Sequence, residues 1–293
     1  MSRKTSSEGS IFSGNKKLIM KTILVPTDFS PVALNALHYA LALAKDLSAK
    51  IILYHSYQIP VTFSEVPVVT ISLEELQKES DAKLQELKND AEHITSHLVP
   101  IEAHNVLGDV VEELDTMCKN YRPFAVVMGT KGAGAIERMI LGSSTIAAIK
   151  KLDVPVLIVP PGASYKPIKK IGFACDFNHV KDTIPVTEIE GLVNTLKASL
   201  HILNVDYNEK HFTGDLTAEL TEMQELIGHL NPKYNYINSL NVEEGINAFA
   251  DANYIDLLLT VPKKHNFWES IFRKSQSSEL VLHSHLPIVA VHK

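Results

Sequence analysis

The sequence has little of what marks several common classes of protein. Its two cysteines, Cys118 and Cys175, lie far apart and in no metal-binding or redox spacing. This usage favours reduced, half-buried thiols in a cytoplasmic protein over a disulfide framework. No uninterrupted apolar run approaches the ~18 to 20 residues of a membrane span, and the formal net charge of -6 offers no basic surface to nucleic acid. We therefore expect neither a membrane nor a nucleic acid among the partners.

Two familiar phosphate-binding motifs are absent as well. A Walker loop needs a glycine followed directly by lysine and then serine or threonine, and the sequence contains no Gly-Lys pair. The dinucleotide fingerprint fails because the position after Gly132 and Gly134 that should be small is Glu137. These absences disfavour a P-loop nucleotidase and a nicotinamide-dependent dehydrogenase.

What remains is a chain of 293 residues, 45% hydrophobic and 21% charged, which is long enough for two ordinary globular domains. Residues 1–19 are rich in serine, lysine and glycine and lack the apolar core of a secretory signal, so we expect a disordered lead. We expect a first domain over residues 20–161, a linker over 162–167 and a second domain over 168–293.

The most informative stretch begins with the apolar run Ala125–Met128 and continues with the spaced glycines Gly129, Gly132 and Gly142. Three hydroxyl side chains follow the last glycine, those of Ser143, Ser144 and Thr145. Such an arrangement is typical of a strand that leads into a helix whose first backbone amides face an anion. We expect the first two glycines to allow a positive φ and a close approach of the backbone to a bound group.

The beginning of the first domain has a second ligand-binding pattern. A short apolar strand ends at Pro26, and Thr27 and Asp28 follow it in a turn. Ser30 is a good helix N-cap and Pro31 a good first helical residue. Ligands of open parallel sheets lie beyond the carboxyl ends of the strands, so this turn and the glycine loop should face one crevice.

Both patterns resemble those of the universal stress protein family. Gly129, Gly132, Gly142 and Ser143 fit its spacing of glycine, two residues, glycine, nine residues, glycine and then serine or threonine, and residues 26–30 look like its opening. The resemblance implies ATP as the ligand, with Mg²⁺ arriving on the nucleotide. It places Asp28 and Ser56 at the adenosine end and the glycines with Ser143 at the phosphates. Lys131 and Arg138 would touch phosphate or remain solvated, and the alternative for Asp28 is a simple turn-former.

The elements alternate between strand and helix, which predicts an α/β fold. Strands are expected at 21–26, 50–57, 99–106, 125–128 and 154–159, with helices at 32–47, from the Ser72–Glu75 capping box to Ile94, at 110–119 and after Gly142. The plan restarts at Ile168, with strands at 169–175, 200–205, 234–237, 256–261 and 287–291, a partly helical stretch at 216–230 and a helix at 242–251. We expect two tandem Rossmann-like domains of the adenine nucleotide alpha hydrolase type, each a five-stranded parallel sheet flanked by helices.

The two expected domains differ at the glycine loop. With Pro155 aligned to Pro287, Lys274 and Ser275 stand where Gly142 and Ser143 stand in the first domain, while Thr260 and Lys263 are taken to replace Gly129 and Gly132. The bulky residues Phe267, Trp268 and Phe272 fill the spacer. We therefore expect the second domain not to bind ATP in the same manner, although the cations Lys263, Lys264, Arg273 and Lys274 could attract another anion.

The last strand of each domain is expected at a sheet edge, and exposed edges are usually covered. In the family such edges pair between subunits. Residues 154–159 are therefore expected to pair with residues 287–291 inside this one chain, as an intramolecular pseudo-dimer. A homodimer of such chains and a protein partner are left open.

The histidine pairs provide no metal site. His93 and His97 lie four residues apart on a predicted helix, but no third ligand is apparent nearby, and a solvated pair is the better interpretation. His283 and His285 are interpreted as surface residues.

The sequence leaves three functional classes open. The favoured hypothesis is a cytoplasmic ATP-binding protein of stress response or signalling. The alternatives are a slow ATPase or adenylate-handling enzyme of the same fold, and an assembly module without nucleotide. Glu137 is the one acid-base candidate in the loop, and no histidine or cysteine lies beside the glycines, so we assign no catalytic residues.

Overall fold

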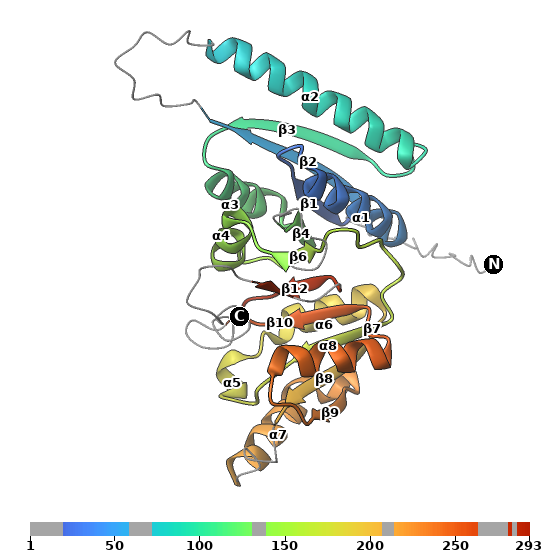
Figure 1. Ribbon diagram of the computed structural model, residues 1–293, viewed down its shortest axis with the longest axis vertical. Coiled ribbons are helices and arrows are strands. Elements are labelled where there is room, and N and C mark those ends of the chain that lie inside the picture. Colours follow the sequence, from blue (N-terminus) through green and yellow to red (C-terminus); the bar gives the residue numbers. More distant parts are fainter. Residues whose placement is uncertain (1–19, 59–71, 131–138, 207–213, 263–280, 283–285) are drawn as a thin grey trace, which may run out of the picture.

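The computed structural model describes residues 20–58, 72–130, 139–206, 214–262, 281–282 and 286–293. Within them, ten strands form one sheet in the order β3-β2-β1-β4-β6-β12-β10-β7-β8-β9, which runs through the whole length of the molecule (Figure 1). We call residues 20–161 the first half and residues 168–293 the second half. The first half supplies the first five strands of that order, and the second half supplies the other five.

The first half alternates strands and helices as the sequence predicts. Its elements are β1 (Thr22–Pro26), α1 (Pro31–Leu47), β2 (Lys50–Tyr57), α2 (Leu73–Ile94), β3 (Ile101–Leu107), α3 (Val110–Tyr121), β4 (Ala125–Gly129), β5 (Met139–Ile140), α4 (Ser143–Lys151) and β6 (Val156–Val159).

The second half repeats this plan, except that the helix after its first strand is divided into α5 and α6 and that a 3-10 turn follows α7. Its elements are β7 (Lys170–Ala174), α5 (Val180–Thr183), α6 (Val186–Leu196), β8 (Ser199–Val205), α7 (Gly214–Ile227), a 3-10 turn (Gly228–Leu230), β9 (Lys233–Ile237), α8 (Val242–Asn253), β10 (Leu257–Thr260), β11 (Val281–Leu282) and β12 (Ile288–Ala290).

The sheet is parallel within each half and antiparallel where the halves meet. All pairs among β3, β2, β1, β4 and β6 are parallel, and so are those among β12, β10, β7, β8 and β9. β6 and β12 pair antiparallel, with Ile158 opposite Ile288 and Val156 opposite Ala290. The two five-stranded parallel sheets and their pairing inside one chain are both confirmed.

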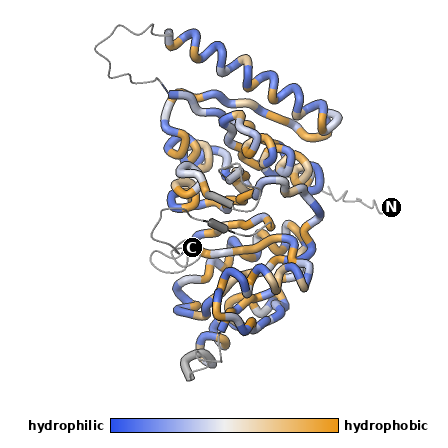
Figure 2. The backbone as a smooth tube through the Cα atoms, in the orientation of Figure 1, coloured by the Kyte–Doolittle hydropathy of each residue, from blue (hydrophilic) through white to orange (hydrophobic). Residues whose placement is uncertain are grey.

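Helices cover the two faces of the sheet. One apolar cluster joins residues of α1, α2, α6 and α7 to one face, and a second joins residues of α3, α4 and α8 to the other. The central strands are mostly hydrophobic, whereas α2 mixes hydrophilic and hydrophobic residues and buries only Ser80, Leu84 and Ala91 (Figure 2). Within the described residues, no helix is both long and apolar enough to cross a membrane.

The start of α1 is built by local sequence. The hydroxyl of Ser30 accepts a hydrogen bond from the amide of Ala33, and Pro31 is the first helical residue, as predicted. The helix ends at Leu47, and the C-cap residue Ser48 adopts the left-handed conformation. α1 is unbroken because residues 32–47 contain no proline, so each of them has an amide hydrogen to donate.

The corresponding helix of the second half is broken, which the sequence analysis did not predict. It consists of the four-residue α5 and of α6, separated by Ile184 and Pro185. Proline has no amide hydrogen to donate within a helix and its ring clashes with the preceding turn. The break therefore follows from Pro185.

Two further expectations need correction. Cys118 and Cys175 are buried, not half-buried, and burial raises the pKa of the Cys118 thiol to about 12. The residue that replaces Gly129 is Val261, not Thr260. Gly129 lies opposite Val159, and Thr260 lies opposite Ala290, which corresponds to Ile158 when the prolines before β6 and β12 are aligned.

Candidate functional site

A cleft of about 730 Å³ lies at the carboxyl ends of β1, β2 and β4 and at the amino end of α4. It brings together nine of the site residues predicted from the sequence. These are Pro26, Thr27, Asp28, Ser56, Gly129, Gly142, Ser143, Ser144 and Thr145. The other three predicted residues, Lys131, Gly132 and Arg138, lie outside the described residues, as does Glu137.

The turn between β1 and α1 fixes Asp28 at the edge of the cleft. The amide of Thr27 donates to the carbonyl of Tyr54 at 2.8 Å, and Nδ1 of His55 donates to the carbonyl of Thr27 at 2.7 Å. Oδ1 of Asp28 accepts from the amide of Ser30 at 3.0 Å. Phe29 turns the chain with a positive φ of 63°. Neighbouring bonds thus hold the turn, while the Asp28 side chain remains exposed.

The amino end of α4 faces the cleft without a side-chain cap. Gly142 is the N-cap residue, with φ -68° and ψ 154°, and it has no side chain that could hydrogen-bond to the first amides of the helix. The first intrahelical bond joins the amide of Ile146 to the carbonyl of Gly142 at 3.0 Å. The amides of Ser143 and Ser144 precede that bond and have no partner inside the helix. They present the positive end of the helix dipole to the cleft.

Thr145 has a structural contact that the sequence did not indicate. Its side chain is buried, and its hydroxyl donates to the carbonyl of Gly129 at 3.1 Å. This bond ties the first turn of α4 to the end of β4. At the other end of α4, Lys151 forms an ion pair with Glu112, as expected for a cation at the negative end of the helix.

Gly129 is needed for a different reason from the one expected. Among the described glycines, only Gly108 and Gly162 have a positive φ. At Gly129 a Cβ would lie 2.5 Å from the carbonyl oxygen of Val32 and 2.9 Å from its carbonyl carbon. The first turn of α1 passes so close to the end of β4 that no side chain fits between them.

Ser56 is also held by a main-chain partner. Its hydroxyl donates to the carbonyl of Gly108 at 2.6 Å, which connects the end of β2 to the loop before α3. The oxygen of that hydroxyl can still accept a hydrogen bond. Ser56 therefore keeps an acceptor that a ligand in the cleft can use.

The sequence analysis missed Thr130, which lines the cleft next to Gly129. Its side chain is 1% exposed, and its Oγ1 has no hydrogen-bond partner among the described residues. A buried hydroxyl without a partner costs free energy unless a ligand or water satisfies it. Its position directly after the first glycine of the pattern was the available signal. Gln58, Val110 and Met128 also line the cleft and were not predicted.

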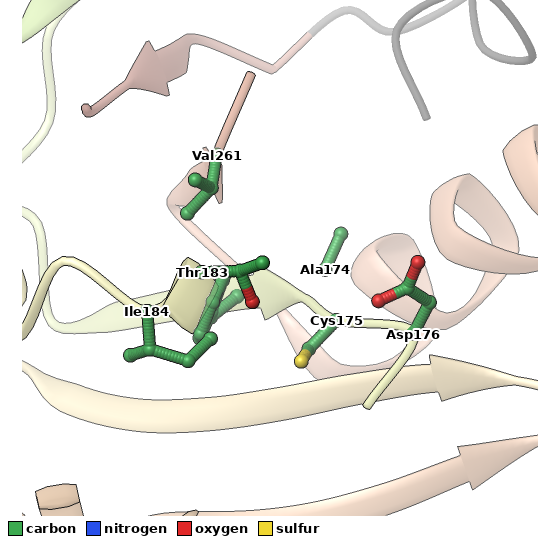
Figure 3. A pocket seen from close by; sticks show the side chains of 7 residues that line it. Ala174, Cys175, Asp176, Thr183, Ile184 and Val261 are labelled. Atoms are coloured by element: carbon green, nitrogen blue, oxygen red, sulfur yellow. The ribbon is translucent and has the colours of Figure 1, made fainter. Parts of the chain in front are cut away.

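The second half repeats the turn, and the described residues around it line only a small cavity. Oδ1 of Asp176 accepts from the amide of Asn178 at 3.1 Å, and Phe177 has a positive φ of 51°, matching Asp28 and Phe29. The cavity beside this turn measures about 10 Å³, which is space for roughly one water molecule. Thr183, Ile184 and Val261 line it together with Cys175 (Figure 3).

The described residues contain no group of three or more histidine, cysteine, aspartate or glutamate side chains that could hold a metal ion. His93 and His97 lie with their ring centroids 5.3 Å apart, and both side chains are exposed. His283 and His285 are outside the described residues.

Comparison with known proteins agrees with the fold. The Universal stress protein family model matches residues 20–160. A universal stress protein of Methanocaldococcus jannaschii is 31% identical over 149 residues, which make up 50% of this chain and 85% of the relative. The chain belongs to the universal stress protein family.

The likeness to solved universal stress proteins extends to both halves. One from Archaeoglobus fulgidus DSM 4304 covers 92% of this chain and 98% of its own, with 20% sequence identity and a TM-score of 0.68. At that identity the comparison shows the fold alone. Another universal stress protein, solved in complex with cAMP, is 25% identical and covers 47% of this chain and 96% of its own, with a TM-score of 0.37.

Proposed function

We propose that this universal stress protein binds ATP in the cleft of its first half and acts in a nucleotide-dependent stress response or in signalling. The single observation that carries the proposal is the meeting of the uncapped end of α4 with Asp28 in one cleft. The cleft, about 730 Å³, has the size of a small-molecule site.

The two ends of the cleft suit the two ends of the nucleotide. The amides of Ser143 and Ser144 and the unpartnered hydroxyl of Thr130 are donors for phosphate oxygens. Asp28 follows β1, the strand next to β4, and its exposed carboxylate can accept hydrogen bonds from the ribose hydroxyls. Mg²⁺ would be bound by the phosphates of the nucleotide. Cys118 and Cys175 are buried thiols, which supports a reducing cytoplasm as the compartment we propose.

Titration of Mg-ATP into wild type and into two variants of Gly142 tests the proposal. Gly142→Lys copies the residue aligned in the second half, and Gly142→Leu adds bulk without charge. Because the N-cap conformation of Gly142 is open to any residue, both variants should fold while obstructing the amides behind it. We expect the dissociation constant to rise about tenfold or more, which corresponds to roughly 1.4 kcal/mol or more.

Gly191 provides the matched control. It is exposed on α6, and a Cβ there would meet no atom within 4 Å. Gly191→Lys and Gly191→Leu should leave the affinity for Mg-ATP unchanged. Equal affinities in all five proteins would refute the assignment of the site, and absence of binding to wild type would refute the proposed ligand. Nucleotide that copurifies with the wild-type protein, identified by absorbance and mass, is the first observation to make.

A further inference from the structure

The second half contacts the chain immediately before α4. β5 and β11 form a two-stranded antiparallel sheet in which Ile140 lies opposite Val281 and Met139 lies opposite Leu282. Ile140 is two residues before Gly142, the N-cap of α4. The main chain that leads into the uncapped helix end is therefore paired with a strand of the other half.

The second half also contacts the far end of α4. The imidazole of His292, just after β12, hydrogen-bonds to the backbone of Ile149 in the last turn of α4. Nε2 of His292 is buried and has no partner among the described residues. Burial lowers the pKa of His292, although the bond to Ile149 and the charge of Asp153 oppose this effect. A neutral imidazole has one N–H to donate, which suits a single bond to a main-chain carbonyl.

Apolar packing adds to these two polar contacts. Ala148, Ile149 and Leu152 belong to the same buried cluster as Ile288 and Ala290 of β12. α4 thus lies between the first half, which binds it through Thr145 and Lys151, and the second half, which holds the chain at both of its ends.

We propose that the second half positions α4 for the ligand of the first half, with β11 fixing the entry to the helix and His292 its last turn. The role rests on the proposed function, because α4 provides the amides that would meet phosphate. Helix amides bind an anion well only when they are held in place before it arrives. The second half would then contribute to the nucleotide site of the first half without binding a nucleotide itself.

Two sets of variants test this role. Val281→Pro/Leu282→Pro removes both amide hydrogens of β11, and Val281→Ala/Leu282→Ala is its control, because it retains them. His292→Ala removes the bond to Ile149, and His292→Gln restores a donor. His229→Ala, at an exposed histidine of the second half that pairs with Glu190, controls for the loss of a histidine.

Three measurements are made on each full-length protein. These are amide hydrogen exchange of residues 143–151 without ligand, the dissociation constant of Mg-ATP and the midpoint of urea unfolding. We expect faster exchange in α4 and about a threefold to tenfold weaker affinity for the proline pair and for His292→Ala, the range of one lost hydrogen bond. The His292→Gln variant should recover part of the protection of α4 from exchange and part of the affinity for Mg-ATP. The midpoint of urea unfolding should change little in all of the variants.

The outcomes separate this proposal from the proposed function. If wild type binds Mg-ATP but neither α4 exchange nor affinity differs among the variants, the positioning role is wrong. If wild type does not bind Mg-ATP, the proposed function fails, and exchange in ligand-free α4 alone decides the positioning role. A uniform loss of stability with no local change in α4 would also overturn it.

Discussion

A Cβ placed on Gly129 would lie 2.5 Å from the carbonyl oxygen of Val32. The end of β4 and the first turn of α1 are therefore in direct main-chain contact beside the cleft. In the second half the equivalent position is Val261, and the equivalent helix breaks after the four residues of α5. There Val261 and the end of α5, at Thr183 and Ile184, line a cavity of about 10 Å³.

Gly129→Ala should destabilise the protein and weaken the binding of Mg-ATP. The new methyl group must displace the main chain at Val32, because a contact of 2.5 Å is far inside van der Waals distance. Overpacking of this kind costs about 1 to 3 kcal/mol. Urea unfolding measures the cost, and calorimetric titration measures the affinity.

Gly191→Ala is the control for that substitution, since Gly191 lies in a helix with open space around its Cα. It should stabilise the protein by roughly 0.5 to 1 kcal/mol, because alanine favours the helix over glycine. Equal unfolding free energies for the two variants would contradict the steric role of Gly129.

Asp28→Asn should weaken the binding of Mg-ATP, whereas Asp176→Asn should not. Each aspartate accepts one amide bond within its turn, and asparagine keeps that acceptor, so both turns should survive. Only Asp28 faces the cleft of about 730 Å³. Loss of a charged hydrogen-bond acceptor should reduce affinity about tenfold or more. Similar losses in the two variants would mean that the second half takes part in binding.

The number of nucleotides bound should be one per chain. The first half has the cleft, and the cavity beside the second copy of the turn is about the size of one water molecule. Isothermal titration calorimetry with Mg-ATP, or the ratio of copurified nucleotide to protein, gives this number. A value near two would show that the second half binds as well.

His201→Ile should stabilise the protein. His201 is 6% exposed, and neither ring nitrogen has a partner among the described residues. The corresponding residue of β2 is Ile52, which is fully buried. Replacing an unsatisfied buried polar group by an apolar one of similar size should gain about 1 to 3 kcal/mol. Urea unfolding at pH 7.5 shows whether the free energy of unfolding rises, as expected, or falls.

The same substitution should flatten the dependence of stability on pH. Burial lowers the pKa of His201 below its ordinary value of 6.5, with help from the charges of Lys233 and Lys170. As the pH falls below that value, the unfolded chain binds a proton that the folded chain does not, so the folded state loses stability. The effect is at most about 1.4 kcal/mol per pH unit.

The parts of the structure that depend on local pattern could be predicted from the sequence. Apolar runs, caps and glycines place Asp28 after β1 and Ser143 after Gly142 correctly, and the rule that ligands lie at the carboxyl ends of strands brings the two turns to one cleft. The pairing of β6 with β12 was predicted from the need to cover two sheet edges and from the resemblance to a family in which these edges pair between subunits. The other inferences need only short stretches of chain and general rules of topology.

The parts that depend on tertiary contacts could not be predicted. The requirement for Gly129 comes from Val32, nearly a hundred residues earlier in the chain. The two-residue pairing of β5 with β11 carries no signal in composition or periodicity.

The antiparallel pairing of β6 with β12 also determines at which edges of the sheet the strands of the two halves end. Every other strand pair in the sheet is parallel, so the strands of the two halves end at opposite rims. Asp28 lies at one rim and Asp176 lies at the other. A small molecule bound beside Asp28 therefore lies at the other edge of the sheet from Asp176, and it would not contact a second molecule bound there.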